Sequence, residues 1–353
     1  MLRIYLQGLL RVECMLNELK SLCALPGVSG REEKVREYII EKIKDKAEIK
    51  VDALGNIIAF VKGRNRAVKR VMADAHMDEV GLIITDVTEG GFLKFATVGG
   101  IDVSVLMARR VIINGDIIGV ISSKPVHLMS ADEKKSMPLE ESLYIDIGVK
   151  DKQEAMKLVS LGDVAVFSDA FQEVGELLVA KAIDDRAGCA VLIDIINSQP
   201  EYDFYATFSV LEEVGAGART AAFGVAPDFA FVIEATTASD IRGVDEGKTV
   251  CNVSGGAVIS FMDRGTVYDR QLFEEVLKTA KEKNIKCQVK RAVAGGNNSA
   301  GIHRTREGVR TAAISVPCRY IHSPSCAASF EDIKSVRALA EAMIMKAASG
   351  EIK

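Results

Sequence analysis

The chain has 353 residues, of which 48% are hydrophobic and 27% are charged, and its formal net charge at pH 7 is −4. This composition is ordinary for a globular protein and excludes an intrinsically disordered chain. Because a negative net charge without clustered Lys and Arg gives no electrostatic footprint for nucleic acid, we expect no nucleic-acid partner. The length exceeds the size at which one hydrophobic core usually stops growing, so we expect two domains.

The cysteines and the amino terminus indicate the cellular compartment in which the protein is expected. The seven cysteines are odd in number and none forms a Cys-x-x-Cys pair, so neither a disulfide framework nor a thiolate metal site is predicted. We expect reduced thiols in the cytoplasm. The first apolar run is interrupted at Gln7, Gly8 and Arg11 before it reaches a membrane-spanning length, so we expect neither a signal peptide nor a membrane anchor. Residues 1–14 precede a second candidate start at Met15 and are a candidate extension outside the fold.

The first part of the chain predicts helices and then strands. Between residues 16 and 46, apolar residues recur at helical spacing on both sides of a Pro-Gly-Val-Ser-Gly break, which predicts two helices around a turn. Ser29 and Glu32 fit a capping box at the start of the second helix. Two edge strands around a Gly-Asn turn and one buried strand are predicted next, over residues 51–55, 57–61 and 68–73.

The hydrophobic pattern changes after Gly81. Short β-like runs with Gly, Asp and Asn turns recur about every eight to twelve residues, a spacing typical of a small barrel or sandwich. We predict an inserted all-β, barrel-like domain over residues 82–169. It interrupts a catalytic domain formed by residues 1–81 and 170–353, in which strands and helices alternate after Phe171. Such alternation predicts an α/β fold with a mostly parallel central sheet and helices on both faces.

A His-x-Asp pair follows the predicted buried strand. Because residues i and i+2 of an extended chain point to the same side, His76 and Asp78 face one site. An imidazole is a common ligand of zinc-like ions, and a carboxylate usually orients it through its other nitrogen. An isolated pair of this kind is more often a buried histidine with a polar neighbour, so the interpretation depends on further ligands.

Further candidate ligands stand where strands end. Five residues lie at or just past the carboxyl end of an apolar strand-like run, where open α/β sheets place their sites: His76, Asp184, Glu213, Glu234 and His322. Five ligands fit two metal ions that share one carboxylate, and Asp184 is the natural bridge because it lies between a strand and a helix. Glu212 and Glu213 are adjacent, so their side chains diverge, which supplies one metal ligand and one general base for a metal-activated water.

Four motifs occur in the order AHMDEVG, AIDDRAG, EEVG and RYIHSP between residues 75 and 324. In this order, over nearly the whole chain after Met15, they resemble the metallopeptidase family that contains the tetrahedral aminopeptidases, the glutamyl aminopeptidases and their clostridial relatives. The resemblance implies a catalytic α/β domain with an inserted β-barrel-like domain and assembly into hollow dodecamers. It also implies a cis peptide bond between Asp184 and Asp185.

The resemblance assigns roles to the candidate residues. It implies two divalent metal ions per subunit, with zinc or cobalt expected and manganese as an alternative. The ligands that it implies are His76, Asp184, Glu213, Glu234 and His322, with Asp184 as the bridge. Glu212 is implied as the general base, and Asp78 as the residue that orients His76.

Three positions depart from the family pattern. Glu234 stands where many members have Asp, and the longer side chain can still coordinate a metal. Asn297 and Asn298 occupy a turn in which relatives usually place an Asp, so no role is assigned to that turn. Ala216 and Gly217 follow the EEVG motif, where a basic residue followed by glycine is more usual.

The motifs predict a cytoplasmic two-metal aminopeptidase that removes the first residue of short peptides. A glycoside hydrolase is a second interpretation, because relatives have been labelled endoglucanases and paired carboxylates also cleave sugars, although that chemistry needs no histidine ligands. A third interpretation is a metal-stabilised assembly or binding protein that has lost catalysis, against which the retention of Glu212 argues.

The motifs contain no residue expected to recognise the side chain of the substrate, and the negative net charge gives no reason to favour acidic peptides. A preference for acidic residues would require a cation in the pocket, and the arginines nearest to the motifs are Arg186, Arg219, Arg242 and Arg319. We expect Arg186 to pair with an acid and Arg219 to face the exterior of a helix. Broad or aliphatic-leaning activity is therefore predicted.

Overall fold

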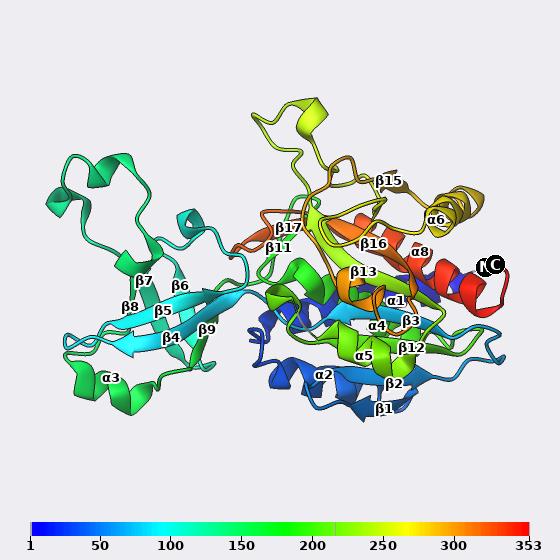
Figure 1. Cartoon of the computed structure of the whole chain (residues 1–353), viewed down its shortest axis with the longest axis horizontal. Coiled ribbons are helices and arrows are strands. Elements are labelled where there is room, and N and C mark those ends of the chain that lie inside the picture. Colours follow the sequence, from blue (N-terminus) through cyan, green and yellow to red (C-terminus); the bar gives the residue numbers. More distant parts are fainter. Residues whose placement is uncertain (1, 216, 353) are drawn as a thin grey trace.

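The computed structural model describes residues 2–215 and 217–352, and Figure 1 shows them as an α/β body from which a smaller β-rich body projects. The α/β body is built on one large sheet. Its main strands lie in the order β1 (Ala47–Val51), β2 (Ile57–Val61), β12 (Phe204–Ser209), β3 (Val71–His76), β13 (Phe229–Thr237), β16 (Arg310–Arg319), β17 (Cys326–Ser329), β11 (Leu177–Ala180) and β10 (Gln172–Val174). Two further strands extend it from β16, namely β14 (Ala257–Ile259) and β15 (Cys287–Val289).

Parallel pairing is concentrated at the centre of this sheet. The four strands β12, β3, β13 and β16 run parallel to one another. Antiparallel hairpins extend both edges, with β1 and β2 on one side and β10 and β11 on the other. The predicted α/β class is confirmed, and the complete sheet is mixed because of these hairpins.

Alternate residues of the central strands pack against different helices. On one face, Val71 and Ala75 of β3 belong to the large hydrophobic core, which also contains residues of α1 (Leu2–Ala24), α2 (Glu33–Ile43), α4 (Ile183–Asn197), α6 (Arg270–Glu282) and α8 (Phe330–Ala348). On the other face, Met72 of β3 packs in a smaller core with α5 (Ala218–Val225) and the short helix α7 (Ser299–Ile302). Every residue of β3 is buried, so the strand that leads to His76 is fixed from both sides.

The projecting body is a closed barrel with its own core, which includes Leu82, Ile113 and Phe167. One helix, α3 (Lys152–Leu158), contributes Ala155 to that core. The strands close in the order β4 (Gly81–Val87), β5 (Leu93–Val98), β8 (Tyr144–Asp146), β7 (Ile117–Ser122), β6 (Arg110–Ile113) and β9 (Val164–Phe167). Residues 82–169 remain the proposed extent of the inserted domain.

The predicted capping box at Ser29 and Glu32 is wrong. α2 begins at Glu33, and Glu32 precedes it without a side-chain cap. The Ser29 hydroxyl instead donates to Asp78 Oδ2 at 2.6 Å, while Glu32 Oε1 accepts from the backbone N–H groups of Gly30 and Leu211. Partners from distant parts of the chain therefore replace the local cap.

α1 runs as one helix from Leu2 to Ala24 and so includes residues 2–14, which remain a candidate extension. One boundary near the amino terminus differs from the prediction. The first edge strand ends at Val51, because Asp52 Oδ1 accepts the N–H groups of Leu54, Gly55 and Asn56 and turns the chain there. Within residues 2–215 and 217–352, no helix combines the length and the apolar character needed to cross a membrane.

A buried ionic cluster joins α1 to the chain around two of the motifs. Lys181 Nζ lies 2.7 Å and 2.8 Å from the two carboxylate oxygens of Glu79, and Arg186 Nη2 lies 3.5 Å from Glu79 Oε1. All three side chains are buried. Lys181 also donates to the carbonyl of Leu25, and Arg186 donates to the carbonyl of Leu22, at the carboxyl end of α1. Arg186 therefore pairs with an acid, as the sequence predicts.

We expect Glu79→Gln to lower the free energy of unfolding by about 3–5 kcal/mol, because it leaves two buried cations without a negative partner. Denaturant unfolding followed by circular dichroism measures the loss. Glu89→Gln is the matched control, because Glu89 also pairs with a lysine, at 3.5 Å from Lys152, but its side chain is 92% exposed. An exposed pair contributes little, so equal losses in the two variants would contradict the prediction.

Candidate metal centre

The ends of separate elements deliver the predicted ligands to one place. β3 ends at His76, and Asp184 lies in the first turn of α4. Glu213 lies in the short 3₁₀ turn Glu212–Val214 that follows β12. Glu234 lies on β13, and His322 lies in the turn between β16 and β17.

These five side chains form two groups of possible metal ligands. One group is His76, Asp184 and Glu234, and the other is Asp184, Glu213 and His322. In each group, one ligand atom from every member lies within 4.8 Å of the others. The structure thus brings all five predicted residues together and places Asp184 in both groups.

The spacing of the donor atoms fits shared ions. His76 Nε2 lies 3.3 Å from Asp184 Oδ1. On the other side, His322 Nε2 lies 3.1 Å from Glu213 Oε2 and 3.4 Å from Asp184 Oδ2. Two donors that each lie 2.0–2.1 Å from one tetrahedral zinc ion are separated by roughly 3.3–3.4 Å. Among the described residues, Glu234 Oε2 is buried without a hydrogen-bond partner, which is the kind of atom that a cation would satisfy.

Buried carboxylates crowd this centre. Burial, reinforced by the neighbouring Glu212 and Asp184, raises the pKa of Glu234 well above its ordinary value. Burial also raises the pKa of Glu213, and it raises the pKa of Glu212 to about 8. Carboxylates held together away from water need a positive partner to remain ionised. His, Asp and Glu donors bind zinc and similar divalent ions, so the residues present fit such ions.

The carboxylate of Asp78 connects the two sides of the centre. Its Oδ1 lies 3.3 Å from His76 Nδ1 and accepts the backbone N–H of Glu212 at 3.1 Å. Its Oδ2 accepts the Ser29 hydroxyl at 2.6 Å and the backbone N–H of Glu213 at 3.1 Å. Burial alone would raise the pKa of Asp78, but these contacts, led by His76, hold the pKa below its ordinary value. Asp78 is therefore in place to orient both His76 and the two glutamates.

Glu212 differs from Glu213 in what its side chain meets. Glu213 belongs to one of the two ligand groups, whereas Glu212 belongs to neither, and its Oε2 lies 3.9 Å from His76 Nε2. Burial, opposed by His76 and reinforced by Glu213 and Asp184, raises the pKa of the half-buried Glu212 carboxyl group to about 8 in the metal-free protein. The two adjacent glutamates thus occupy different positions at the centre.

Sequence reasoning missed a buried polar network behind His76. Asp74 lies two residues earlier on β3 and is fully buried. Its carboxylate accepts hydrogen bonds from Thr207 Oγ1 at 2.5 Å, Ser209 Oγ at 3.2 Å and Asn298 Nδ2 at 2.8 Å. Asn298 is one of the departures from the family pattern, and this contact gives it a structural partner. The alternation that places Asp74 and His76 on one face of β3 was a signal that could have found it.

Two further sequence predictions concern the backbone around the centre. The peptide bond between Asp184 and Asp185 is cis, which confirms the prediction. Asp185 is buried, and its carboxylate accepts the backbone N–H groups of His76 and Gly188. Ala216, where the sequence departs from the family pattern after EEVG, lies outside the described residues.

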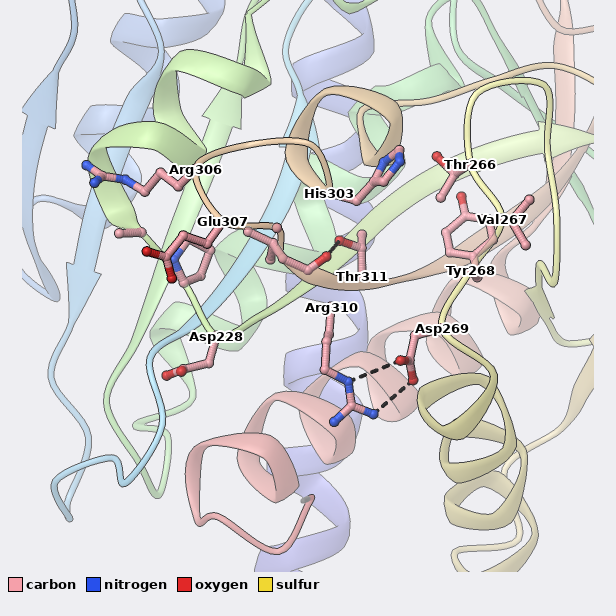
Figure 2. Close-up of a pocket in the computed structure, with 14 residues that line it drawn as sticks. Asp228, Thr266, Val267, Tyr268, Asp269, His303, Arg306, Glu307, Arg310 and Thr311 are labelled. Carbon is pink, nitrogen blue, oxygen red and sulfur yellow. Dashed lines mark hydrogen bonds and ion pairs between the residues drawn. The ribbon is translucent and has the colours of Figure 1, made fainter.

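A large groove lies away from this centre. It has a volume of about 800 Å³ and lies at the amino ends of β13 and β16, opposite the strand ends that carry the ligands. Figure 2 shows that its charged side chains include Arg310 and Asp269, which pair with each other at 2.8 Å. A smaller cavity of about 10 Å³ lies at the centre itself, between Asp184, Glu213 and His322. The donor chemistry therefore favours the strand ends over the larger groove.

An α/β body with an inserted barrel, and two donor groups that share a carboxylate at its strand ends, is the architecture of a metal-dependent peptidase. The sequence model described as M42 glutamyl aminopeptidase matches residues 55–339, and the chain belongs to this family. It is similar to a putative aminopeptidase of Acetivibrio thermocellus, with 38% identity over 94% of this chain and 99% of that protein. It is also 31% identical to a lysyl aminopeptidase of Pyrococcus furiosus, over 92% of this chain and 95% of that protein.

Solved structures agree with this assignment. An aminopeptidase from the archaeon Desulfurococcus kamchatkensis superposes with a TM-score of 0.91 at 32% identity, covering 97% of each chain. The TET1 peptidase of Pyrococcus horikoshii, which can assemble into a tetrahedron or a large octahedral shell, superposes with a TM-score of 0.82 at 34% identity, covering 94% of this chain and 99% of that one. The protein is thus an aminopeptidase of the M42 family, a hydrolase that acts on peptides.

We expect divalent ions to displace protons from this centre. Burial alone would lower the pKa of His322, but the carboxylates of Asp184 and Glu213 raise it to about 11, so the imidazole is protonated at pH 7 without a metal. A metal ligand must be the neutral imidazole, so Zn²⁺ binding should release protons and weaken as the pH falls. Calorimetric titration in two buffers of different ionisation enthalpy measures the release. Binding heats that do not depend on the buffer would contradict the prediction.

Proposed function

We propose that the protein is a two-metal aminopeptidase that removes the amino-terminal residue of short peptides, with Glu212 as general base. The observation that carries the proposal is the position of Asp184 in both donor groups, beside a glutamate that belongs to neither group. We propose His76, Asp184, Glu213, Glu234 and His322 as the ligands. Nitrogen and oxygen donors of this kind suit zinc or cobalt, with manganese as an alternative.

When bound, the two ions would polarise the scissile carbonyl and lower the pKa of the attacking water. Glu212 is proposed to accept the proton of that water and to return it to the leaving amine. Burial raises the pKa of Glu212 above that of an ordinary carboxyl group, and bound cations would lower it towards a value at which the group is ionised and can accept a proton. Asp78 holds the backbone N–H groups of Glu212 and Glu213, so it sets the position of the base relative to its neighbouring ligand.

The other interpretations of the sequence are less favoured. A glycoside hydrolase needs two carboxyl groups flanking the scissile bond and no imidazoles among them, whereas both donor groups here contain a histidine. A metal-stabilised protein without catalysis would not require a buried glutamate beside the ligands. The clustering of Glu212 with the two groups therefore supports an enzyme.

The compartment and the assembly are further proposals. All seven cysteines are free in the structure, which supports a reducing compartment such as the cytoplasm. We propose a homo-oligomer, a dodecamer by the family resemblance, and the assembly described for the TET1 peptidase of Pyrococcus horikoshii supports it.

The arginines considered for substrate recognition do not favour an acidic preference. Arg319 forms a two-point ion pair with Asp240, with both distances at 2.8 Å, and Arg186 is buried against Glu79. Arg219 and Arg242 are exposed. We therefore propose broad or aliphatic-leaning specificity at the substrate's first residue.

Glu212→Gln should keep both metal ions but lose activity by a factor on the order of 10²–10⁴, because the substitution removes only the proton shuttle. Elemental analysis of the purified variant and hydrolysis of an aminoacyl chromogenic amide, with and without chelator, measure the two quantities. Glu213→Gln is the matched comparison and should lose metal as well as activity. If Glu212→Gln loses metal and Glu213→Gln does not, the roles of the two glutamates are exchanged.

A panel of aminoacyl amides tests the proposed specificity. We expect kcat/KM for a leucine amide to equal or exceed that for a glutamate amide, because Arg186 and Arg319 already have acidic partners. A glutamate or aspartate amide cleaved more than about tenfold better than leucine, a difference of about 1.4 kcal/mol at the transition state, would overturn the proposal. Arg242 and Arg319 would then be the first positions to substitute.

A further inference from the structure

The barrel reaches the metal centre through one turn. Gly99 and Gly100 follow β5 and form this turn, called here the barrel turn. The carbonyl oxygen of Gly100 lies 2.9 Å from His322 Nδ1. Because a carbonyl can only accept a hydrogen bond, Nδ1 carries a proton, so in the neutral imidazole that binds a metal the lone pair lies on Nε2. Nε2 is the atom that faces Glu213 and Asp184.

The same turn also packs against the second ligand of this group. Gly99 has a φ of +84°, and a Cβ added there would lie 2.7 Å from Val80 Cγ1 and 3.2 Å from Glu213 Cβ. A Cβ added at Gly100 would lie 3.4 Å from His322 Nδ1. Gly99 therefore lets the backbone of the barrel approach Glu213 more closely than a side chain would allow, and Gly100 brings its backbone carbonyl to His322.

The other donor group is oriented within the α/β body. His76 Nδ1 faces Asp78, and the backbone N–H of His76 donates to Asp185. His76 is 1% exposed and Glu234 is 6% exposed, whereas the side chain of His322 is 31% exposed. The two groups share Asp184, but one of them has a partner from the barrel and the other is held by strands of the sheet and α4.

We propose that the barrel turn is a positioning element for the ion site formed by Asp184, Glu213 and His322, and that the site formed by His76, Asp184 and Glu234 does not depend on it. This inference rests on the proposed two-metal function. The inserted barrel thereby completes one of the two ion sites through the contact of Gly100 with His322 and the packing of Gly99 on Glu213. The affinity of that site depends on how the barrel docks on the α/β body.

Gly99→Ala is the test, because the added methyl group would lie 2.7 Å from Val80 Cγ1 and 3.2 Å from Glu213 Cβ, so the turn must shift relative to these residues. Loss of an outer contact to a metal ligand typically lowers metal affinity by about 10–100-fold, so one of the two ion affinities should fall by that factor and the other should not change. Calorimetric titration of the metal-free enzyme with Co²⁺, together with the absorption spectrum of the bound Co²⁺, measures both. The remaining ion should give the spectrum found in His322→Ala and not the spectrum found in Glu234→Ala.

Gly148→Ala is the matched control. Gly148 lies in the same barrel with a φ of +77°, so an alanine there meets the same backbone strain, but a Cβ would have no heavy atom within 4 Å. It should leave both ion affinities unchanged. If Gly99→Ala does not fold, as judged by circular dichroism, the double variant Val80→Ala and Gly99→Ala replaces it, because it removes the 2.7 Å clash with Val80 Cγ1 and keeps the 3.2 Å contact with Glu213 Cβ.

The possible outcomes separate this inference from the proposed function. A wild-type enzyme that binds two ions and cleaves peptides, with both affinities unchanged or equally weakened in Gly99→Ala, overturns the role of the barrel turn and leaves the two-metal function intact. A wild-type enzyme that binds fewer than two ions overturns the proposed function itself.

Discussion

The centre depends on one buried carboxylate, that of Asp78. Its two oxygens face the imidazole of His76, the hydroxyl of Ser29 and the backbone N–H groups of Glu212 and Glu213 at once. A carboxylate with this many donors is held in one orientation, and it holds its donors in turn. The end of β3, the turn before α2 and the turn after β12 are separate in sequence, and this one group fixes them relative to one another.

The parts of the centre that could be predicted from the sequence are those marked by a particular residue type at a particular place, namely His, Asp and Glu at the ends of apolar runs. His76 ends β3 and Asp78 comes just after it. Asp184, Glu213 and His322 follow other strands, and Glu234 lies on β13, so the topology of an α/β sheet brings them to one edge. The contacts that support these residues could not be predicted from residue type and position in the sequence. Gly100 acts through a backbone carbonyl that every residue possesses, and the Ser29 hydroxyl occupies a position that also fits a helix cap.

The same distinction holds for the fold. The change of period after Gly81 predicted the β-rich insertion, because a barrel and an α/β body bury their side chains with different periods. The edge strand β10 was harder to predict. All three of its residues are exposed, so it lacks the apolar run that marks a central strand.

The buried cluster around Glu79 has a consequence for how the molecule unfolds. The last carbonyls of α1 are bound by Lys181 and Arg186, which share Glu79 as their counter-ion. The first helix therefore ends on side chains that belong to the chain leading into the metal centre, and its carboxyl end cannot fray without uncovering charges next to that centre. The end of α1 and the edge of the sheet that carries the candidate ligands should therefore unfold together. Proteolysis at the end of α1 would then be accompanied by disorder of the turn that carries Asp184.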